Sequence, residues 1–259
     1  MTRRFLPGLL IALGVLVLGL LVAFTVGRYP VTLAELTEVL VSRLMGRTTA
    51  VPPAVENVVL LVRGPRVVAA VLVGGALAVA GTAFQGLFRN PLVSPDILGA
   101  SSGAALGAVL GILAATTVSD LLPLTGPVAV GTIVLIALRW RLNVMSLPED
   151  EARALGLATG PFRIAIVAAA TLVTSASVAT SGIIGWVGLV VPHLARALVG
   201  PDFPRLIPTA ALLGGGYLLF IDTLARTAAP VEIPLGILTA VIGTPFFIWL
   251  LAGMQRTWS

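Results

Sequence analysis

The sequence predicts an all-α fold, a polytopic bundle of transmembrane helices, and three observations lead to it. Hydrophobic residues make up 58% of the 259-residue chain and charged residues only 10%, whereas soluble domains carry about 25% charged residues. Apolar runs of about 20 residues recur, the length needed to cross a hydrocarbon core. These runs are continuous rather than alternating, so they predict helices and not the strands of a closed barrel.

We expect about eight spans within a single membrane domain, residues 1–259. The first apolar run follows Arg3 and Arg4. It is too long for the apolar part of a typical signal peptide and no small-x-small cleavage site closes it, so we interpret it as the first membrane helix. An even number of spans places both termini on one side, which we expect to be cytoplasmic. The expected spans are residues 5–26, 66–87, 97–118, 126–138, 162–180, 183–199, 207–224 and 235–252.

The distribution of charge supports this topology. The net charge is +5, and all 16 basic residues are arginine, gathered at the ends of apolar runs as topology determinants are rather than as a nucleic-acid surface. Ten arginines fall on the expected inner side and six on the outer side, which agrees modestly with the positive-inside rule. The inner ten are Arg3, Arg4, Arg89, Arg139, Arg141, Arg153, Arg163, Arg196, Arg205 and Arg256; the outer six are Arg28, Arg43, Arg47, Arg63, Arg66 and Arg226.

Residue types that are missing exclude several kinds of chemistry. Without lysine the chain cannot form a GxxxxGK[ST] phosphate-binding loop, so any ATP that drives it is hydrolysed by another chain. Without cysteine it forms no disulfide, thiolate metal site or cysteine nucleophile. The single histidine, His193, has no neighbouring acid, so we expect a structural hydrogen bond beside Pro192 and no metal site. No catalytic residues are predicted.

The more polar stretch 27–65 is expected to lie outside the membrane, on the outer side. Thr32 and Glu35 predict a capping box that opens a short surface helix. In Arg63-Gly64-Pro65-Arg66, proline fixes the chain before a helix start, and both arginines are expected to point outward. They suit either lipid phosphates or the carboxylates of a docking protein. Arg226 falls on the same side, which favours docking.

A second polar stretch, residues 146–157, predicts a short helix on the inner side. Ser146 with Glu149 reads as a capping box, acids fill the first turn, and Gly156 can end the helix. Such a helix is too polar to span. It is either a connecting loop that happens to be helical or a surface presented to a cytoplasmic partner.

Residues 81–103 form the third notable stretch. Gly81 and Gly86 allow close helix packing, and Gln85 is a polar residue at membrane depth that needs a partner. Small residues here suit either helix packing or the narrow lining of a translocation path. The residues assigned to one or other of these roles are Gln85, Asn90, Pro91, Gly99, Ser101, Ser102 and Gly103.

The order of these motifs resembles the FecCD family of permease subunits from bacterial ABC importers for ferric siderophores, haem and cobalamin. The resemblance rests on Arg63 to Arg66, Gly75 to Gln85, Arg89 to Leu92, Leu98 to Ala104, Glu151 to Gly156, Gly185 to His193, Asp222 to Arg226, Ile233 to Ala240 and Gly243 to Leu250. It implies a bacterial inner-membrane protein that works as a homodimer or heterodimer with two ABC ATPases and a substrate-binding protein. It implies no cofactor on this chain, with ATP bound by the ATPases.

The same resemblance assigns roles to individual residues. Arg63, Arg66 and Arg226 match arginines that meet glutamates of the binding protein. Residues 146–157 match the coupling helices that sit in a groove of the ATPase. The residues carried over to this coupling role are Ser146, Glu149, Glu151, Ala152, Arg153, Leu155 and Gly156.

One departure from the family pattern is large. The family usually has ten spans and over 300 residues, but here Gly111-Ile112-Leu113 is followed within about 30 residues by Asn143 to Leu147. The fourth and fifth family helices, the fifth of which helps line the pore, are expected to be missing. The expected function is import of ferric siderophores; the alternatives are haem or cobalamin as cargo, or a shortened, transport-inactive paralogue that acts as an assembly partner.

Overall fold

The computed structural model describes residues 5–95 and 113–255, and within these ranges every regular element is helical. Four residues assigned to the translocation path or to packing (Gly99, Ser101, Ser102 and Gly103) lie outside the described residues. The elements are α1 (Phe5–Thr25), α2 (Leu33–Met45), α3 (Pro53–Asn57), a π-helical turn (Val58–Arg63), α4 (Gly64–Leu87), a 3-10 turn (Leu113–Ala115), α6 (Val118–Ala137), α7 (Arg139–Met145), α8 (Glu149–Ala154), α9 (Thr159–Ser181), α10 (Val187–Val199), α11 (Phe203–Thr227) and α12 (Leu235–Gln255).

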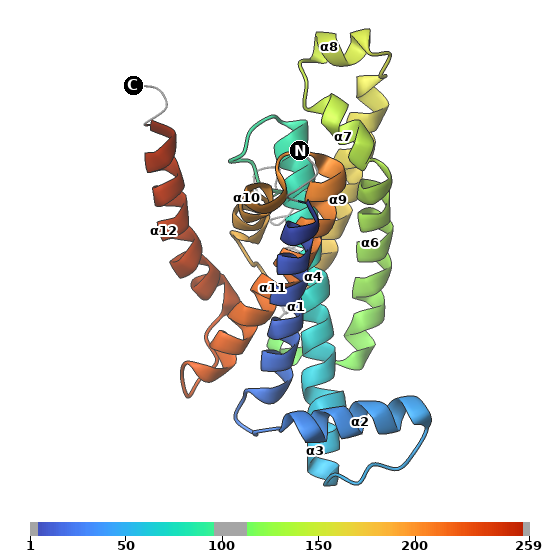
Figure 1. The fold of residues 1–259 in the computed structure, drawn as a ribbon, viewed down its shortest axis with the longest axis vertical. Coiled ribbons are helices and arrows are strands. Elements are labelled where there is room, and N and C mark those ends of the chain that lie inside the picture. Colours follow the sequence, from blue (N-terminus) through green and yellow to red (C-terminus); the bar gives the residue numbers. More distant parts are fainter. Residues whose placement is uncertain (1–4, 96–112, 256–259) are drawn as a thin grey trace.

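The predicted class, an all-α membrane bundle, is confirmed. In the described ranges five helices are long and apolar enough to cross a membrane, and α10 and α12 contribute two shorter apolar helices. Figure 1 shows α7 and α8 at one end of the bundle, with the start of α1 and the end of α12, and α2 and α3 at the other. These are called the α8 end and the α2 end below.

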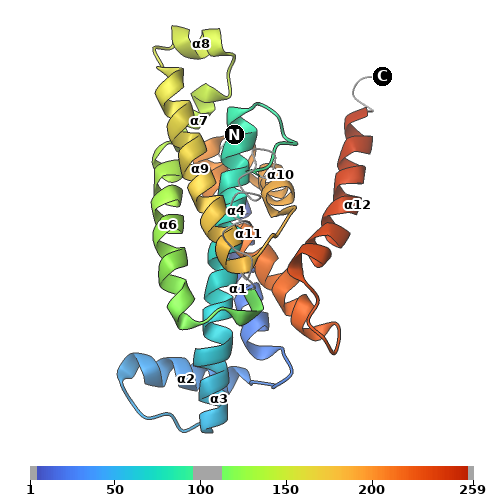
Figure 2. The ribbon, with the colours of Figure 1, turned by 180° about the vertical axis from the view of Figure 1, so that it is seen from behind.

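Helix α4 is the centre of the bundle. It stands between α1 and α11 on one side and α6 and α9 on the other, as the opposite views in Figure 1 and Figure 2 show. It packs closely on α11: a Cβ added to Gly74 would lie 2.2 Å from the carbonyl oxygen of Gly214. A Cβ on Gly81 would similarly lie 2.0 Å from the carbonyl oxygen of Gly188 on α10. Backbones approach this closely only where both helices carry small residues.

The start of the second span differs from the prediction. Instead of beginning at Arg66, the helix runs without a break from Pro53 to Leu87. The Gly64 N–H donates to the Val59 carbonyl, one residue further back than in an α-helix. This wider π-helical turn carries the helix past Pro65, which has no N–H to donate. Part of the stretch 27–65 is therefore an extension of the central helix.

The third and fourth predicted spans also differ from the structure. Most of the third, residues 97–112, lies outside the described residues. The predicted end of the third span at Val118 is wrong, because Val118 begins α6, and α6 is a full 20-residue helix rather than a short one starting at Gly126. A capping box formed by Thr117 and Asp120 fixes this earlier start. Pro123 lies inside the helix, which membrane helices tolerate.

The sixth predicted span, residues 183–199, is helical only from Val187. The preceding residue, Trp186, has a φ of +71°, a conformation that bulky side chains rarely adopt. It is stabilised by packing on α12, where a Cβ on Gly243 would lie 2.5 Å from the Trp186 ring. Phe247 makes an edge-to-face contact with the same ring at 5.8 Å.

Candidate functional site

Four charged residues meet near the α2 end of the bundle and form what we call the outer charge cluster: Arg66, Asp222, Arg226 and Glu232. Arg66 Nε donates to Asp222 Oδ1 at 2.8 Å, and its Nη1 lies 3.0 Å from Glu232 Oε1. Arg226 Nε lies 3.1 Å from Asp222 Oδ2, close enough for an ion pair although without hydrogen-bond geometry. The cluster links α4, α11 and the loop that leads to α12.

Burial makes this cluster electrostatically strong. The Asp222 side chain is fully buried, and those of Arg66 and Arg226 are 9% and 11% exposed. Only Glu232, at 40%, reaches solvent appreciably. Since charges are stable away from water only when paired, the two arginines and Asp222 depend on each other.

Arg63 lies close by but has different partners. Its guanidinium donates to the backbone carbonyls of Phe24 and Tyr29, at the end of α1 and in the loop that follows. Gly27 makes room for it, because a Cβ there would lie 2.5 Å from an Arg63 nitrogen. Counted as whole residues, Arg63 and Arg66 are 5% and 7% exposed. The prediction that both side chains point outward is therefore wrong.

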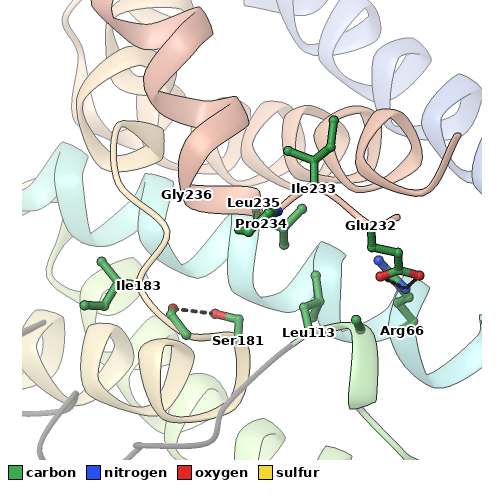
Figure 3. A pocket seen from close by; sticks show the side chains of 11 residues that line it. Arg66, Leu113, Ser181, Ile183, Glu232, Ile233, Pro234, Leu235 and Gly236 are labelled. Carbon is green, nitrogen blue, oxygen red and sulfur yellow. Dashed lines mark hydrogen bonds and ion pairs between the residues drawn. The ribbon is translucent and has the colours of Figure 1, made fainter. Parts of the chain in front are cut away.

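A pocket of about 360 Å³ opens beside the outer charge cluster. Figure 3 shows the Arg66–Glu232 pair at one side, Ile233 to Gly236 along another, and Ser181 and Ile183 facing them from the end of α9. Leu113 and Ala114 complete the lining. A rearrangement that separates Glu232 from Arg66 would thus change both the pocket and the start of α12.

At the α8 end, the polar segment 146–157 folds as a helix, but its N-terminus differs from the prediction. Ser146 is no cap: its hydroxyl donates to the Asn143 carbonyl and ends α7, and Pro148 occupies the N-cap position of α8. Glu149 instead pairs with Arg153 at 2.6 Å. The predicted end is confirmed, because Gly156 has a φ of +78° and its N–H donates to the Arg153 carbonyl.

The outer surface of α8 is open. Glu151, Arg153 and Leu155 are exposed, and Leu155 is 67% exposed although it is apolar. Ala152 is buried. Figure 1 shows the helix standing beyond the ends of α6 and α9. This arrangement leaves α8 free to contact another protein.

Gln85 has the partners that its depth requires. It is 3% exposed, its Nε2 donates to the Gly188 carbonyl at 3.3 Å, and its Oε1 accepts from Arg196 Nη1 at 2.6 Å. Asn90 accepts from the Leu92 N–H and shapes the turn that begins after α4, in which Pro91 follows. Of these residues only Gln85 is buried in the helix packing.

Metal binding finds no support in the described part of the chain, where no group of three or more His, Cys, Asp or Glu residues could hold an ion. His193 packs edge-to-face on Phe246. Among the described residues its Nδ1 has no hydrogen-bond partner, so this nitrogen does not make the structural hydrogen bond expected of the histidine.

Comparison with known proteins explains this architecture. The profile of the FecCD transport family matches residues 15–121 and 109–253. The chain belongs to this family. It is 30% identical, over 93% of its length and 94% of the relative's, to the molybdate import system permease protein MolB of Haemophilus influenzae. An iron chelatin transport system permease protein of Helicobacter pylori is also 30% identical, over 75% of this chain and 82% of that one.

A solved structure extends the likeness to the fold. An inward-facing metal-chelate type ABC transporter superposes with a TM-score of 0.82 at 30% identity, covering 95% of this chain and 98% of the other. This chain is thus a multi-pass membrane permease subunit of an ABC importer and not itself an enzyme. Permeases of this class work with an ATPase and a binding protein.

The alignment also shows how the chain is shortened. The match to MolB spans 320 aligned positions, but the chain has only 259 residues, so more than 60 positions hold no residue of this chain. Two membrane helices with their connections need about that many. The two profile matches overlap at residues 109–121, which places the missing stretch near the start of α6.

The family resemblance includes Asp222 among its matching residues but assigns it no role, and no sequence motif points to Glu232. The one available signal for Asp222 was its position four residues before Arg226 on an apolar helix, a spacing at which opposite charges meet. Glu232 lies 166 residues from Arg66 in a loop, so no local pattern could pair them.

Proposed function

We propose that this permease imports ferric siderophores across a bacterial inner membrane, with both termini in the cytoplasm. The family match over most of the chain carries the importer assignment, and the likeness to iron-chelatin and metal-chelate transport proteins supports the cargo. Haem and cobalamin, and molybdate by the likeness to MolB, are the competing cargoes. The chain itself binds no cofactor; ATP is bound by two partner ATPases.

The test is uptake into proteoliposomes that contain the permease with its ATPase and a binding protein. Radiolabelled ferric siderophore, haem, cobalamin and molybdate are compared at equal concentration. The proposal expects ATP-dependent uptake of the siderophore alone, with ATP hydrolysis stimulated by the loaded binding protein. Uptake without any ATPase, or preference for another cargo, contradicts it.

The α2 end is proposed as the docking surface for the binding protein, through Arg63, Arg66 and Arg226. The burial of these arginines suggests how docking works. The fork of Arg66 is already held by Asp222 and Glu232, and Glu232 is the more exposed acid. A glutamate of the binding protein would exchange with Glu232 and so release the loop before α12. Glu232→Gln is then expected to tighten docking, measured by surface plasmon resonance, whereas weaker docking contradicts the exchange.

At the opposite end, α8 is proposed to couple the permease to the ATPase. Its three acids, Arg153 and the exposed Leu155 offer both charge and an apolar contact. Glu151→Arg is expected to weaken co-purification of the ATPase by roughly tenfold, about 1.4 kcal/mol. Glu38→Arg reverses an acid on a short helix at the other end and is the matched control. Equal loss in both variants contradicts the assignment.

One specific observation supports a second candidate function. More than 60 aligned positions of the relative are missing, and by family resemblance they include a pore-lining helix. A shortened paralogue would still bind the ATPase through α8 but would move no cargo. Retained ATPase association with no uptake of any of the four cargoes distinguishes this alternative from the importer.

A further inference from the structure

A second pocket, of about 370 Å³, lies at the α8 end where α4, α10 and α11 meet. We call it the Arg196 pocket. It is lined by Gln85, Gly86, Arg89, Asn90, Pro91, Ser146, His193, Arg196, Pro201 and Phe203. Two arginines and a histidine are among these residues, and no acid is.

Arg196 is the first reason to assign a ligand to this pocket. It is partly buried on α10, and the one hydrogen bond found for its side chain in residues 5–95 and 113–255 is the 2.6 Å bond to Gln85. A guanidinium carries five N–H donors, so most of its donor capacity is unused. An interior positive charge is costly without an anion beside it, and in the described ranges no carboxylate lies within ion-pair distance of Arg196.

Arg63 shows that a buried arginine in this protein can have its donors satisfied without a carboxylate. It too has no carboxylate partner within the described ranges, but two backbone carbonyls accept from it and fill the space around it. Arg196 has one neutral partner and faces an open cavity. Since Arg63 has acceptors that Arg196 lacks, the protein does not generally leave buried arginine donors unsatisfied. We therefore attribute the open space beside Arg196 to a ligand.

The other polar groups around the pocket are compatible with the same ligand. Arg89 is exposed, its backbone has a φ of +51°, and its side chain has no hydrogen bond or ion pair within the described ranges. Backbone strain of this kind costs free energy and persists where the surroundings require it. Asp202, the acid nearest in sequence to Arg196, is bound by Asn143 and pairs with Arg205.

We propose that the Arg196 pocket binds one oxyanionic group of the phosphate type, held by Arg196 and Arg89. Arginine forks match the oxygens of such groups. The cavity is larger than one tetrahedral anion, so the group can belong to a phospholipid headgroup of the adjacent leaflet or to a free anion. The proposal does not depend on the cargo.

The test uses the full chain in micelles of a maltoside detergent, which carries no phosphate of its own. In one arm inorganic phosphate is titrated and followed by calorimetry; in the other, phosphatidylglycerol is added and retained lipid is counted by native mass spectrometry. A lipid site responds in the second arm only, and a free-anion site in the first. The expected result is saturable binding in one arm, weakened roughly tenfold to a hundredfold by Arg196→Gln, the range for hydrogen bonds to charged groups.

Two further variants keep the test decisive. Arg89→Gln replaces the test variant if Arg196→Gln fails to fold. It changes an exposed side chain, so it should weaken binding without disturbing the fold. Arg141→Gln removes an exposed arginine at the same end and should leave binding unchanged. No saturable binding in either arm, or equal weakening by Arg141→Gln and Arg89→Gln, overturns the proposal.

Discussion

Loss of the Asp222 charge is predicted to destabilise the protein more than any other single charge change at the α2 end. In Asp222→Asn the amide fills the same space, but Arg226 keeps only neutral partners, the Ala23 carbonyl at 3.2 Å and the Thr223 hydroxyl at 3.3 Å. Breaking a buried ion pair costs about 3–5 kcal/mol. Because Arg66 retains Glu232, we expect the lower limit, about 3 kcal/mol.

The assay is thermal unfolding of the purified protein in detergent. A change of 1 kcal/mol shifts Tm by about 2–4 °C in chains of roughly this size, so Asp222→Asn should lower Tm by about 6–12 °C. Glu232→Gln is the matched control. Its side chain is 40% exposed, and pairs that reach solvent contribute about 0–1 kcal/mol, so the expected shift is below about 4 °C.

A double variant separates charge from packing. If Asp222→Asn is harmful because it leaves Arg226 buried and unpaired, then Asp222→Asn with Arg226→Gln should recover part of the lost stability. Contacting residues show coupling of about 0.5–3 kcal/mol. Equal Tm values for Asp222→Asn and Glu232→Gln, or strictly additive losses in the double variant, would refute this explanation of the outer charge cluster.

Three other predictions follow from the helix packing and the surface helices. Gly214→Leu should prevent α4 and α11 from closing and abolish the folded protein, measured as monodisperse yield in detergent, while Gly14→Leu should not, since nothing lies within 4 Å of a Cβ there. Ala152→Glu places a charge at the buried position of α8 and should unfold that helix, which limited proteolysis near residue 152 detects. Hydrogen bonds from the Thr32 backbone N–H and hydroxyl hold the pKa of Glu35 below its ordinary value. The cap on α2 is therefore fully formed above the unfolded pKa of about 4.3 and is lost as pH falls through the lower folded value. The check is a fall in the amide protection factors of α2, which are corrected for the intrinsic exchange rate, at acid pH in the wild type and not in Glu35→Gln.

Long apolar runs made most of the fold predictable, but local turn chemistry set the boundaries. The spans at α1, α9 and α11 lie within a few residues of their predicted positions, because hydropathy fixes where a membrane helix must be. The start of α6 was missed because its capping box ends in aspartate rather than glutamate. Gly182 and Gly185 lie at the break before α10, but Trp186 in the left-handed region carries no sequence signal of its own.

The candidate sites were likewise predictable only where local sequence features define them. The α8 helix was predictable since its acidic first turn and Gly156 are local features. The surroundings of Arg66 were not, because they depend on residues more than 150 positions away that meet only after α4 and α11 pack. An arginine at the end of an apolar run reads as exposed from sequence, and only the tertiary structure shows the buried acid beside it.

The stretch that this chain lacks relative to its longer relatives affects transport more than folding. In the bundle, α4 is buried over 83% of its apolar window, whereas α1 is buried over 11%, so the central helix is covered without the missing stretch. Covering comes from α11, α9, α10 and α6. Gly74 and Gly81 of α4 allow the close approach of α11 and α10. A Cβ on Gly131 would lie 2.3 Å from Val173 of α9, so α6 and α9 also pack directly on each other. The shortened chain thus retains a core, an α8 surface and an outer charge cluster, and any loss of uptake should arise in the pathway itself while partner binding persists.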